Sequence, residues 1–315
     1  MTLVIDAHVH LGVDPAHGFR LSRSELIERM DRGGVHVAVA APFPGKPMAR
    51  ANEALAAALG DRIIGAGLIR PGSADAVAEV DRLVDDYGMK AALIDIEATF
   101  EYFLAHGVLG KRDGAAFDRL AQRALPVFLH THHPLQRFIT ADLAIGVDAL
   151  ARRYPGLPLI VNTRIPSLTL VLGHANVYVE SSLDTASPVD LDSIRRQVGA
   201  NRLLFASNAP IEHPLIKKMA FERTSASESE RALMLGGNVA RLLKIEHPHS
   251  NSGATMEDAN SGMGAAPVAQ ATASVAAPPI TVNELERRLA SWLPKLDDAE
   301  PVTVFQPRRG KTDVR

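Results

Sequence analysis

Eight short apolar runs recur along residues 1–246, and stretches with helical periodicity separate most of them. Several runs are continuous in Val, Ile and Leu, which is typical of strands buried on both faces of a parallel sheet. Eight strands alternating with helices over this length match a (β/α)8 barrel in size and order, so we expect an α/β fold of the TIM type. The expected strands are Leu3–Asp6, Val35–Ala40, Ile63–Ile69, Ala91–Asp95, Pro126–His130, Leu159–Thr163, Val177–Glu180 and Leu203–Ser207.

A doubly wound open sheet is the rival fold, because it also alternates strands and helices. That fold would place a Gly-rich phosphate loop directly after its first strand, and the sequence IDAHVHLGVD has none there. The missing phosphate loop therefore favours the barrel over the open sheet. The expected helices are Ser22–Arg32, which opens with a possible capping box, Met48–Leu59, Ser73–Tyr87, Gly114–Arg123, Ala141–Tyr154 and Leu191–Val198.

The composition excludes several classes of function. The chain of 315 residues has a formal net charge of −2, which argues against a protein that works on nucleic acid. It contains no cysteine, so a metal would have to be held by His, Asp or Glu. No apolar run reaches the roughly 18 residues of a membrane span, and the first residues lack the pattern of a signal peptide. We expect a cytoplasmic protein that acts on a small molecule.

Chemistry in a TIM barrel sits at the carboxyl ends of the strands. His8 and His10 follow the first expected strand, and side chains spaced i, i+2 on an extended segment project to the same side. His130 ends the fifth expected strand, so the three imidazoles are predicted to hold one cation together. Other polar residues at strand ends, any of which could supply a base, are Asp95, Glu97, His132, His133, Glu180 and His213.

Five segments resemble the amidohydrolase-related (amidohydrolase 2) branch of the metal-dependent hydrolase superfamily. IDAHVH is similar to its first-strand D-x-H-x-H signature, and PVFLHTHHP to its fifth-strand His segment. NVYVESS resembles its seventh-strand run, RLLFASNAP its eighth-strand segment, and ALMLGGNVARLL its closing helix. The resemblance covers roughly residues 3–246. It implies a distorted TIM barrel that uses a divalent metal, most readily zinc, for hydrolysis, hydration or non-oxidative decarboxylation.

The chain departs from this family pattern at two positions. Thr163 stands where the family has a sixth-strand His, and Asn208 where it has an eighth-strand Asp. That Asp normally touches the metal and takes a proton from the attacking water, which a neutral amide cannot do. The resemblance thus assigns the metal to His8, His10 and His130, with a reduced ligand set. The candidate catalytic residues are Asn208, His132, Glu180 and Arg164.

Three functions remain open at this point. Three protein ligands are enough for a catalytic zinc, so the protein could be a working metal-dependent hydrolase or lyase. It could instead be a catalytically inactive accessory subunit that binds a partner protein. It could also decarboxylate without metal, using a His and Arg164. The guanidinium of Arg164 or of Arg137 could pair with a substrate carboxylate, and for Arg137 a local surface salt bridge is the favoured alternative.

The composition changes after residue 246. From Ser250 to Ile280, 19 of the 31 residues are Ala, Gly, Ser or Pro, and such a stretch cannot bury enough apolar surface to fold. We interpret residues 247–280 as a flexible linker. Residues 281–315 form a tail in which Leu285, Leu289 and Trp292 make one helical apolar stripe. This stripe could pack on its own barrel, on a second copy in a homo-oligomer, or on a partner protein.

Removing all residues after Ile245 should separate the possibilities for the tail. If the tail docks on another molecule, the truncated barrel should stay folded and keep its activity but lose an oligomer or partner, measured by size-exclusion chromatography. If the tail belongs to the barrel's own fold, the melting temperature should fall by several degrees with no change in assembly. The second result would contradict docking.

Overall fold

A computed structural model describes residues 2–15, 17–43, 47–95, 111–130, 141–162, 172–182 and 187–245. The expected linker at 247–280 and the tail at 281–315, with Leu285, Leu289 and Trp292, lie outside these ranges and stay predictions. Among the described residues, no helix has both the length and the apolar character needed to cross a membrane.

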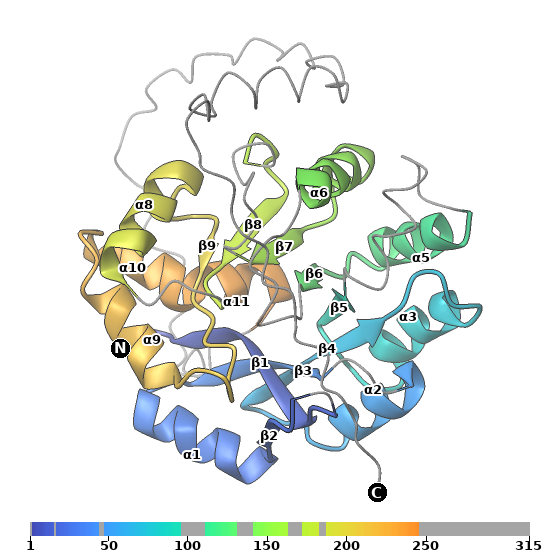
Figure 1. Ribbon diagram of the computed structural model, residues 1–315, viewed down its shortest axis with the longest axis horizontal. Helices are drawn as coiled ribbons and strands as arrows, with labels where there is room; N and C mark the ends of the chain where they lie inside the picture. The colour runs from blue at the N-terminus through green and yellow to red at the C-terminus, as the bar shows by residue number, and fades with distance from the viewer. Residues whose placement is uncertain are drawn as a thin grey trace, which may run out of the picture. The chain divides into compact units, whose positions relative to one another are not determined.

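The described strands form one curled sheet in the order β2-β1-β3-β4-β5-β6-β7-β8-β9. Neighbouring strands are parallel throughout, except that the short β2 pairs antiparallel with β1. Figure 1 shows these strands at the centre of a surrounding layer of helices. The strands are β1 (Ile5–Val13), β2 (Arg20–Leu21), β3 (Val37–Pro42), β4 (Ile63–Ile69), β5 (Ala91–Asp95), β6 (Val127–His130), β7 (Leu159–Asn162), β8 (Val177–Glu180) and β9 (Leu203–Leu204).

Backbone hydrogen bonds join the last strand segment to the first. The Ala7 amide donates to the Phe205 carbonyl (2.8 Å), and the His10 amide donates to the Ala209 carbonyl (2.7 Å). Between them, the Asn208 amide donates to the His8 carbonyl at 2.9 Å. The sheet therefore closes on itself. This arrangement confirms the TIM-like α/β barrel and excludes the doubly wound open sheet.

Six helices follow the strands where the sequence predicts them, whereas the helices at Pro214–Glu222 and Glu228–Ala232 were not expected. Ser22 begins α1 with the expected capping box, since its Oγ accepts from the Glu25 amide (3.3 Å) and Glu25 Oε2 accepts from the Ser22 amide (2.8 Å). The helices are α1 (Arg23–Gly33), α2 (Met48–Ala56), α3 (Ala76–Asp85), α5 (Lys111–Gln122), α6 (Ala141–Arg153), α8 (Pro188–Val198), α9 (Pro214–Glu222), α10 (Glu228–Ala232), the π-helical turn η1 (Leu233–Gly237) and α11 (Asn238–Leu243).

The first and the last expected strand differ most from the observed ones. The first strand was expected to stop at Asp6, but β1 runs on to Val13 and includes both His8 and His10. An irregularity in the pairing with β3 between Asp6 and Val9 lets the strand continue past the expected end. The last strand was expected to reach Ser207, but β9 pairs with β8 only at Leu203 and Leu204. The residues that follow bond to β1 instead.

The apolar core has two layers. One cluster of side chains, drawn mostly from alternate strand positions, fills the inside of the barrel, and a larger cluster lies between the strands and the helices. The inner cluster forms the floor beneath the strand ends. Its members include Ile5, Ala7, Val39, Leu68, Leu93, Phe128, Ile160, Leu204 and Ala206.

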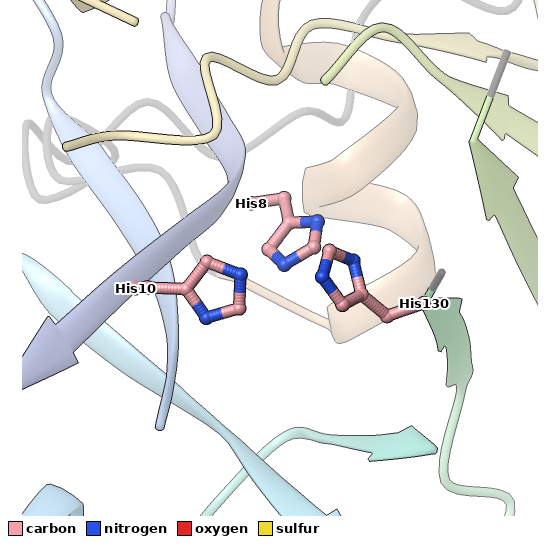
Figure 2. A group of neighbouring side chains, drawn as sticks. All are labelled: His8, His10 and His130. Carbon is pink, nitrogen blue, oxygen red and sulfur yellow. The ribbon is translucent and has the colours of Figure 1, made fainter. Parts of the chain in front are cut away.

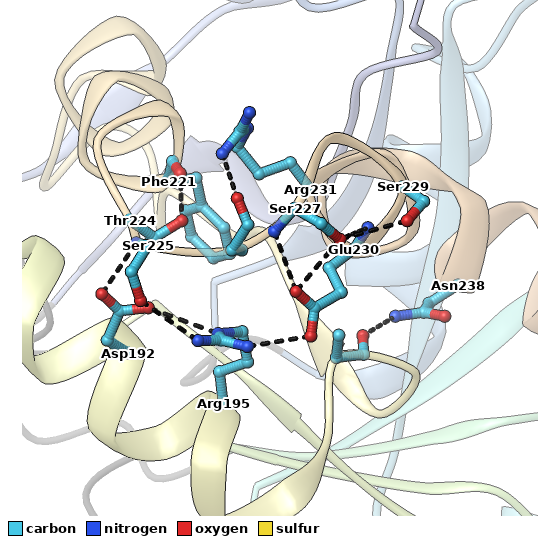
Figure 3. A network of polar contacts seen from close by, with 12 residues as sticks. Asp192, Arg195, Phe221, Thr224, Ser225, Ser227, Ser229, Glu230, Arg231 and Asn238 are labelled. Carbon is cyan, nitrogen blue, oxygen red and sulfur yellow. Dashed lines mark hydrogen bonds and ion pairs between the residues drawn. The ribbon is translucent and has the colours of Figure 1, made fainter.

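A polar network fastens the outer helices near the end of the barrel (Figure 3). The guanidinium of Arg195 on α8 donates to Glu230 Oε1 on α10 at 2.8 Å and to Ser225 Oγ at 3.2 Å. Asp192 Oδ2 accepts from the Ser225 amide at 2.8 Å. These bonds fix the segment between α9 and α10, which leads into the closing helix.

The closing helix lies directly against the start of the barrel. Asn238 Nδ2 donates to the carbonyls of Ala200 (2.8 Å) and Leu203 (3.0 Å), which anchors α11 beside β9. At Gly236, within η1, an added Cβ would stand 2.3 Å from the Leu3 carbonyl oxygen. Only glycine allows the helix to approach β1 this closely.

Replacing Gly236 with alanine should therefore destabilise the barrel. Overpacking of this kind costs about 1–3 kcal/mol, and each 1 kcal/mol lowers the melting temperature of a domain this size by about 2–4 °C. Gly156→Ala is the matched control, because a Cβ there meets nothing within 4 Å. Equal melting temperatures for the two variants, measured by circular dichroism, would contradict the close approach.

Candidate metal centre

A layer of buried polar side chains lies directly above the apolar floor of the barrel. Strand side chains alternate between faces, so a residue two positions after an inner apolar residue also faces inward. His130 follows Phe128 in this way, and Asn162 follows Ile160. Every member of the layer is at most 3% exposed. The members whose side chains the structure describes are His8, His10, His130, Asn162, Glu180 and Asn208.

The three imidazoles of this layer converge, as the sequence predicts. Figure 2 shows His8 and His10 on one strand facing His130 on another. Their ring centroids are 4.7–5.0 Å apart, and one ligand atom from each lies within 4.8 Å of the others. That spacing is close to the roughly 4 Å that two metal–nitrogen bonds span. This group could hold a metal ion.

Glu180 orients the ring of His8. Its Oε1 lies 3.4 Å from His8 Nδ1. Ser182 holds the carboxylate in place, since its amide donates to Oε2 (2.7 Å) and its hydroxyl to Oε1 (2.6 Å). A carboxylate at Nδ1 favours the tautomer that carries the proton there and leaves the Nε2 lone pair as a ligand. His8 Nε2 is buried and has no hydrogen-bond partner among the described residues.

Neighbouring groups also fix the ring of His10, the second imidazole on β1. His10 Nδ1 lies 3.4 Å from the Pro42 carbonyl oxygen, which orients the ring as Glu180 orients that of His8. Phe43 stacks on His10 with centroids 4.8 Å apart and an interplanar angle of 19°. The ring of Phe128 lies 5.7 Å from that of His8. These aromatic side chains shield the imidazoles from water on two sides.

Asp6 holds together the two chain segments that carry His8 and Asn208. Its Oδ1 accepts from the Ser207 amide (2.8 Å) and its Oδ2 from the Ser207 hydroxyl (2.5 Å). Oδ1 also lies 3.4 Å from the His8 amide. Burial raises the pKa of the Asp6 carboxyl to about 6, although the bonds from Ser207 oppose the shift. Asp6 therefore positions the strand ends.

Asn208 occupies the position at which the family resemblance expects an aspartate. Its backbone is left-handed, with φ of 56°, a conformation that Asn and Asp adopt more readily than most residues. Its Oδ1 is buried and makes no hydrogen bond to the described part of the chain. An amide oxygen thus stands in the polar layer beside His8.

Of the other expected site residues, most are not described by the structure, and His213 takes another position. Arg164, His132 and Thr163 lie outside the described residues, as do Glu97, His133 and Arg137. For Asp95 the structure gives only the strand position, opposite His130. His213, considered above as a base, begins α9, and its Nδ1 accepts from the Leu215 amide at 3.2 Å. Burial and the nearby guanidinium groups of Arg29 and Arg32 lower the pKa of His213.

Three residues with clear partners near the strand ends were not predicted. Ser182 and Ser207 bind the Glu180 and Asp6 carboxylates. The only sequence signal was the E-x-S spacing within NVYVESS. His17, to which the sequence assigned no role, lies 2.9 Å from the buried carboxylate of Asp14 in the segment between β1 and β2.

Comparison with known proteins agrees with this architecture. A family model described as amidohydrolase matches residues 5–245. Similar solved structures include 2,6-dihydroxybenzoate decarboxylase from Rhizobium, with 18% identity, a TM-score of 0.64, and coverage of 78% of this chain and 99% of that one. A dihydroxybenzoic acid decarboxylase from Polaromonas with bound manganese is 17% identical, with a TM-score of 0.63 and coverage of 78% of this chain and 98% of that one. The 4-oxalomesaconate hydratase from Rhodopseudomonas palustris is 15% identical, with a TM-score of 0.62 and coverage of 77% of this chain and 96% of that one.

These identities are low enough that the solved structures establish the fold alone. Among curated protein sequences, none matches the chain significantly.

The contact between Glu180 and His8 predicts a loss of metal affinity in Glu180→Gln. An amide can still accept a hydrogen bond but brings no charge, so the His8 tautomer is less firmly set. Loss of such an outer partner typically weakens metal binding by about 10–100-fold. Calorimetric titration with Mn²⁺ or Zn²⁺ would measure this, with Glu230→Gln as a control far from the imidazoles. Unchanged affinity in Glu180→Gln would contradict the orienting role.

Proposed function

We propose, from the premise that this chain belongs to the amidohydrolase family, that it is a metal-dependent lyase or hydrolase acting on a small carboxylated substrate at the barrel mouth. The observation that carries the proposal is the convergence of His8, His10 and His130 at buried strand ends. The decarboxylases and the hydratase of the same fold support it.

The three residues fit a divalent cation. Imidazole nitrogens suit zinc, manganese and related metals, and His8 Nε2 is a buried ligand atom with no other described partner. A cation bound there would supply Lewis-acid polarisation of a substrate oxygen. Zinc was the expected metal, and manganese is the alternative because a relative of the same fold holds it.

The other residues of the centre prepare it for a substrate. Glu180 and the Pro42 carbonyl set the orientation of two imidazoles, so that these rings need not reorganise on binding. Phe43 and Phe128 keep water from two sides of the rings. Arg164 is proposed to bind the substrate carboxylate, and His132 to transfer a proton.

Asn208 favours lyase chemistry over hydrolysis. Hydrolysis needs a base that removes a proton from water, and the amide of Asn208 cannot take one at neutral pH. Non-oxidative decarboxylation needs no such step. It requires a bound carboxylate, a polarised oxygen and a proton for the carbon that loses carbon dioxide.

A second candidate, the inactive accessory subunit, is favoured by the same residue. If the chain abandoned catalysis, Asn208→Asp alone should restore little activity, because Thr163 would still lack an imidazole. The double variant Asn208→Asp, Thr163→His should nevertheless raise metal affinity. Wild-type turnover at about 1 per second or faster, an ordinary enzyme rate, would contradict abandonment.

Metal content gives the direct test of the proposed centre. Protein purified without a His tag should contain about one equivalent of divalent metal, measured by mass spectrometry, and His10→Ala should lose it. His174→Gln is the matched control. His174 lies in the segment before β8, at the opposite end of the strands from the site, and its imidazole pairs with Asp148 at 2.7 Å. Equal metal content in His10→Ala and the wild type would contradict the proposed site.

Activity should be sought with aromatic and unsaturated carboxylates. Carbon dioxide release from 2,6-dihydroxybenzoate tests decarboxylation, and loss of 4-oxalomesaconate tests hydration. Activity that survives in His10→Ala would point to chemistry without the metal.

A further inference from the structure

A surface groove runs between α1 and the beginning of α9, two helices that lie side by side (Figure 1). We call it the α1–α9 groove. One wall is the exposed side of α1, and the other is the segment 210–213 with the first turn of α9. Its volume is about 690 Å³, and no described member of the polar layer lines it. The groove is therefore a feature separate from the metal centre.

Two polar contacts hold the walls of the groove in place. The Arg29 guanidinium on α1 donates to the Pro210 carbonyl across the groove at 3.3 Å. Within the other wall, the ammonium of the buried Lys217 lies 2.7 Å from Glu212 Oε2. Both contacts fix the segment 210–213 against the helices. A surface that is already formed loses less conformational freedom when a partner binds, which favours association.

The groove exposes a group of large apolar side chains. Ile211 and Ile216 line it, and Leu215 precedes Ile216 at the start of α9. Ile216 is 62% exposed, and the other two are 37% and 38% exposed. Apolar side chains exposed singly are ordinary on protein surfaces, whereas a group of them marks an interaction surface. The other exposed large apolar residues of the described structure come singly from five elements and are Val13, Val77, Ile145, Val189 and Leu233.

Charged side chains of both signs line the same groove. The α1 wall carries Glu25 and Glu28 together with Arg29 and Arg32, so its charges balance. Glu28 and Arg32 pair with each other, but their side chains are 60% and 67% exposed. Such a surface pair adds little to stability, and its members can exchange partners on association. A strongly acidic or strongly basic partner would meet like charges here, so the groove fits a partner that carries both signs.

We propose that the α1–α9 groove is the interface of a homodimer in which a second copy of the chain packs on it about a two-fold axis. In an interface of this symmetry, residue i contacts residue j and residue j contacts residue i. A balanced surface is then complementary to itself, because glutamates of one protomer can face arginines of the other. Ile211, Leu215 and Ile216 supply the apolar centre and the charges supply the rim, as in known interfaces. The dimer does not depend on the proposed function, and its interface is distinct from the tail.

The mass of the full-length chain in solution tests the proposal. Light scattering coupled to size-exclusion chromatography should give twice the mass of one chain. Ile216→Asp should weaken the dimer, because the symmetry places the new charge in the apolar centre twice. Loss of a central contact of this kind raises a dissociation constant by about 30-fold or more. Val189→Asp is the matched control, since it adds the same charge to a side chain that is 72% exposed on α8, outside the groove.

Charge reversal tests the self-complementarity by itself. Glu28→Arg makes the balanced α1 wall basic, and Arg32→Glu makes it acidic. Each variant alone should dimerise more weakly than the wild type, because like charges then meet across the two-fold axis. An equimolar mixture of the two variants should form a heterodimer, since a basic wall then faces an acidic one. Both side chains are largely exposed, so neither change disturbs the core.

Four results would overturn the proposal. The first is a monomeric wild type at micromolar concentration. The second is a dimer that Ile216→Asp leaves intact, which would place the interface elsewhere. The third is an equal loss of dimer in Val189→Asp, and the fourth is a mixture of the two charge variants that stays monomeric. If circular dichroism showed Ile216→Asp to be unfolded, the charge variants would still decide.

Discussion

The bond between Asp6 and Ser207 joins residues about 200 positions apart and closes the barrel around its own site. Two hydrogen bonds from one serine to one buried carboxylate fix the end of the chain's last barrel segment against its first strand. The neighbouring residues on the two segments are His8 and Asn208, whose backbones are bonded to each other. The same contact thus completes the fold and sets the spacing within the polar layer.

A single rule of strand geometry organises the interior. Alternation places apolar residues such as Leu93, Phe128 and Ile160 in one inner layer, and the next inward position on several strands carries a polar group. The floor is therefore dry and the layer above it is rich in hydrogen-bonding groups. A cation bound in that layer would interact with imidazole and amide dipoles in a medium of low dielectric constant, where such groups act strongly.

The sequence predicts the barrel well because its strongest signals are local. Runs such as Ile63–Ile69 and Ala91–Asp95 are bounded as expected, and the capping box at Ser22 begins its helix. The convergence of His8, His10 and His130 follows once the strands are ordered. Contacts between distant segments escape such reasoning. That β1 continues past Asp6, that β9 stops at Leu204, and that Ser207 bonds to Asp6 all depend on the closure, which no local pattern encodes.

The position of Ser207 in the chain has a consequence for how the protein is made. During synthesis, His8 and His10 emerge first and His130 more than 100 residues later. The part of β1 before its pairing with β2 keeps one unpaired edge until the segment near Ser207 leaves the ribosome. An unpaired edge of this kind invites pairing with other chains. Loop closure over about 200 residues is slow to form, since its entropy cost precedes its gain. The nascent barrel therefore carries this unpaired edge for most of its translation, and the arrival of the segment after β9 both pairs the edge and completes the layer of imidazoles and amides.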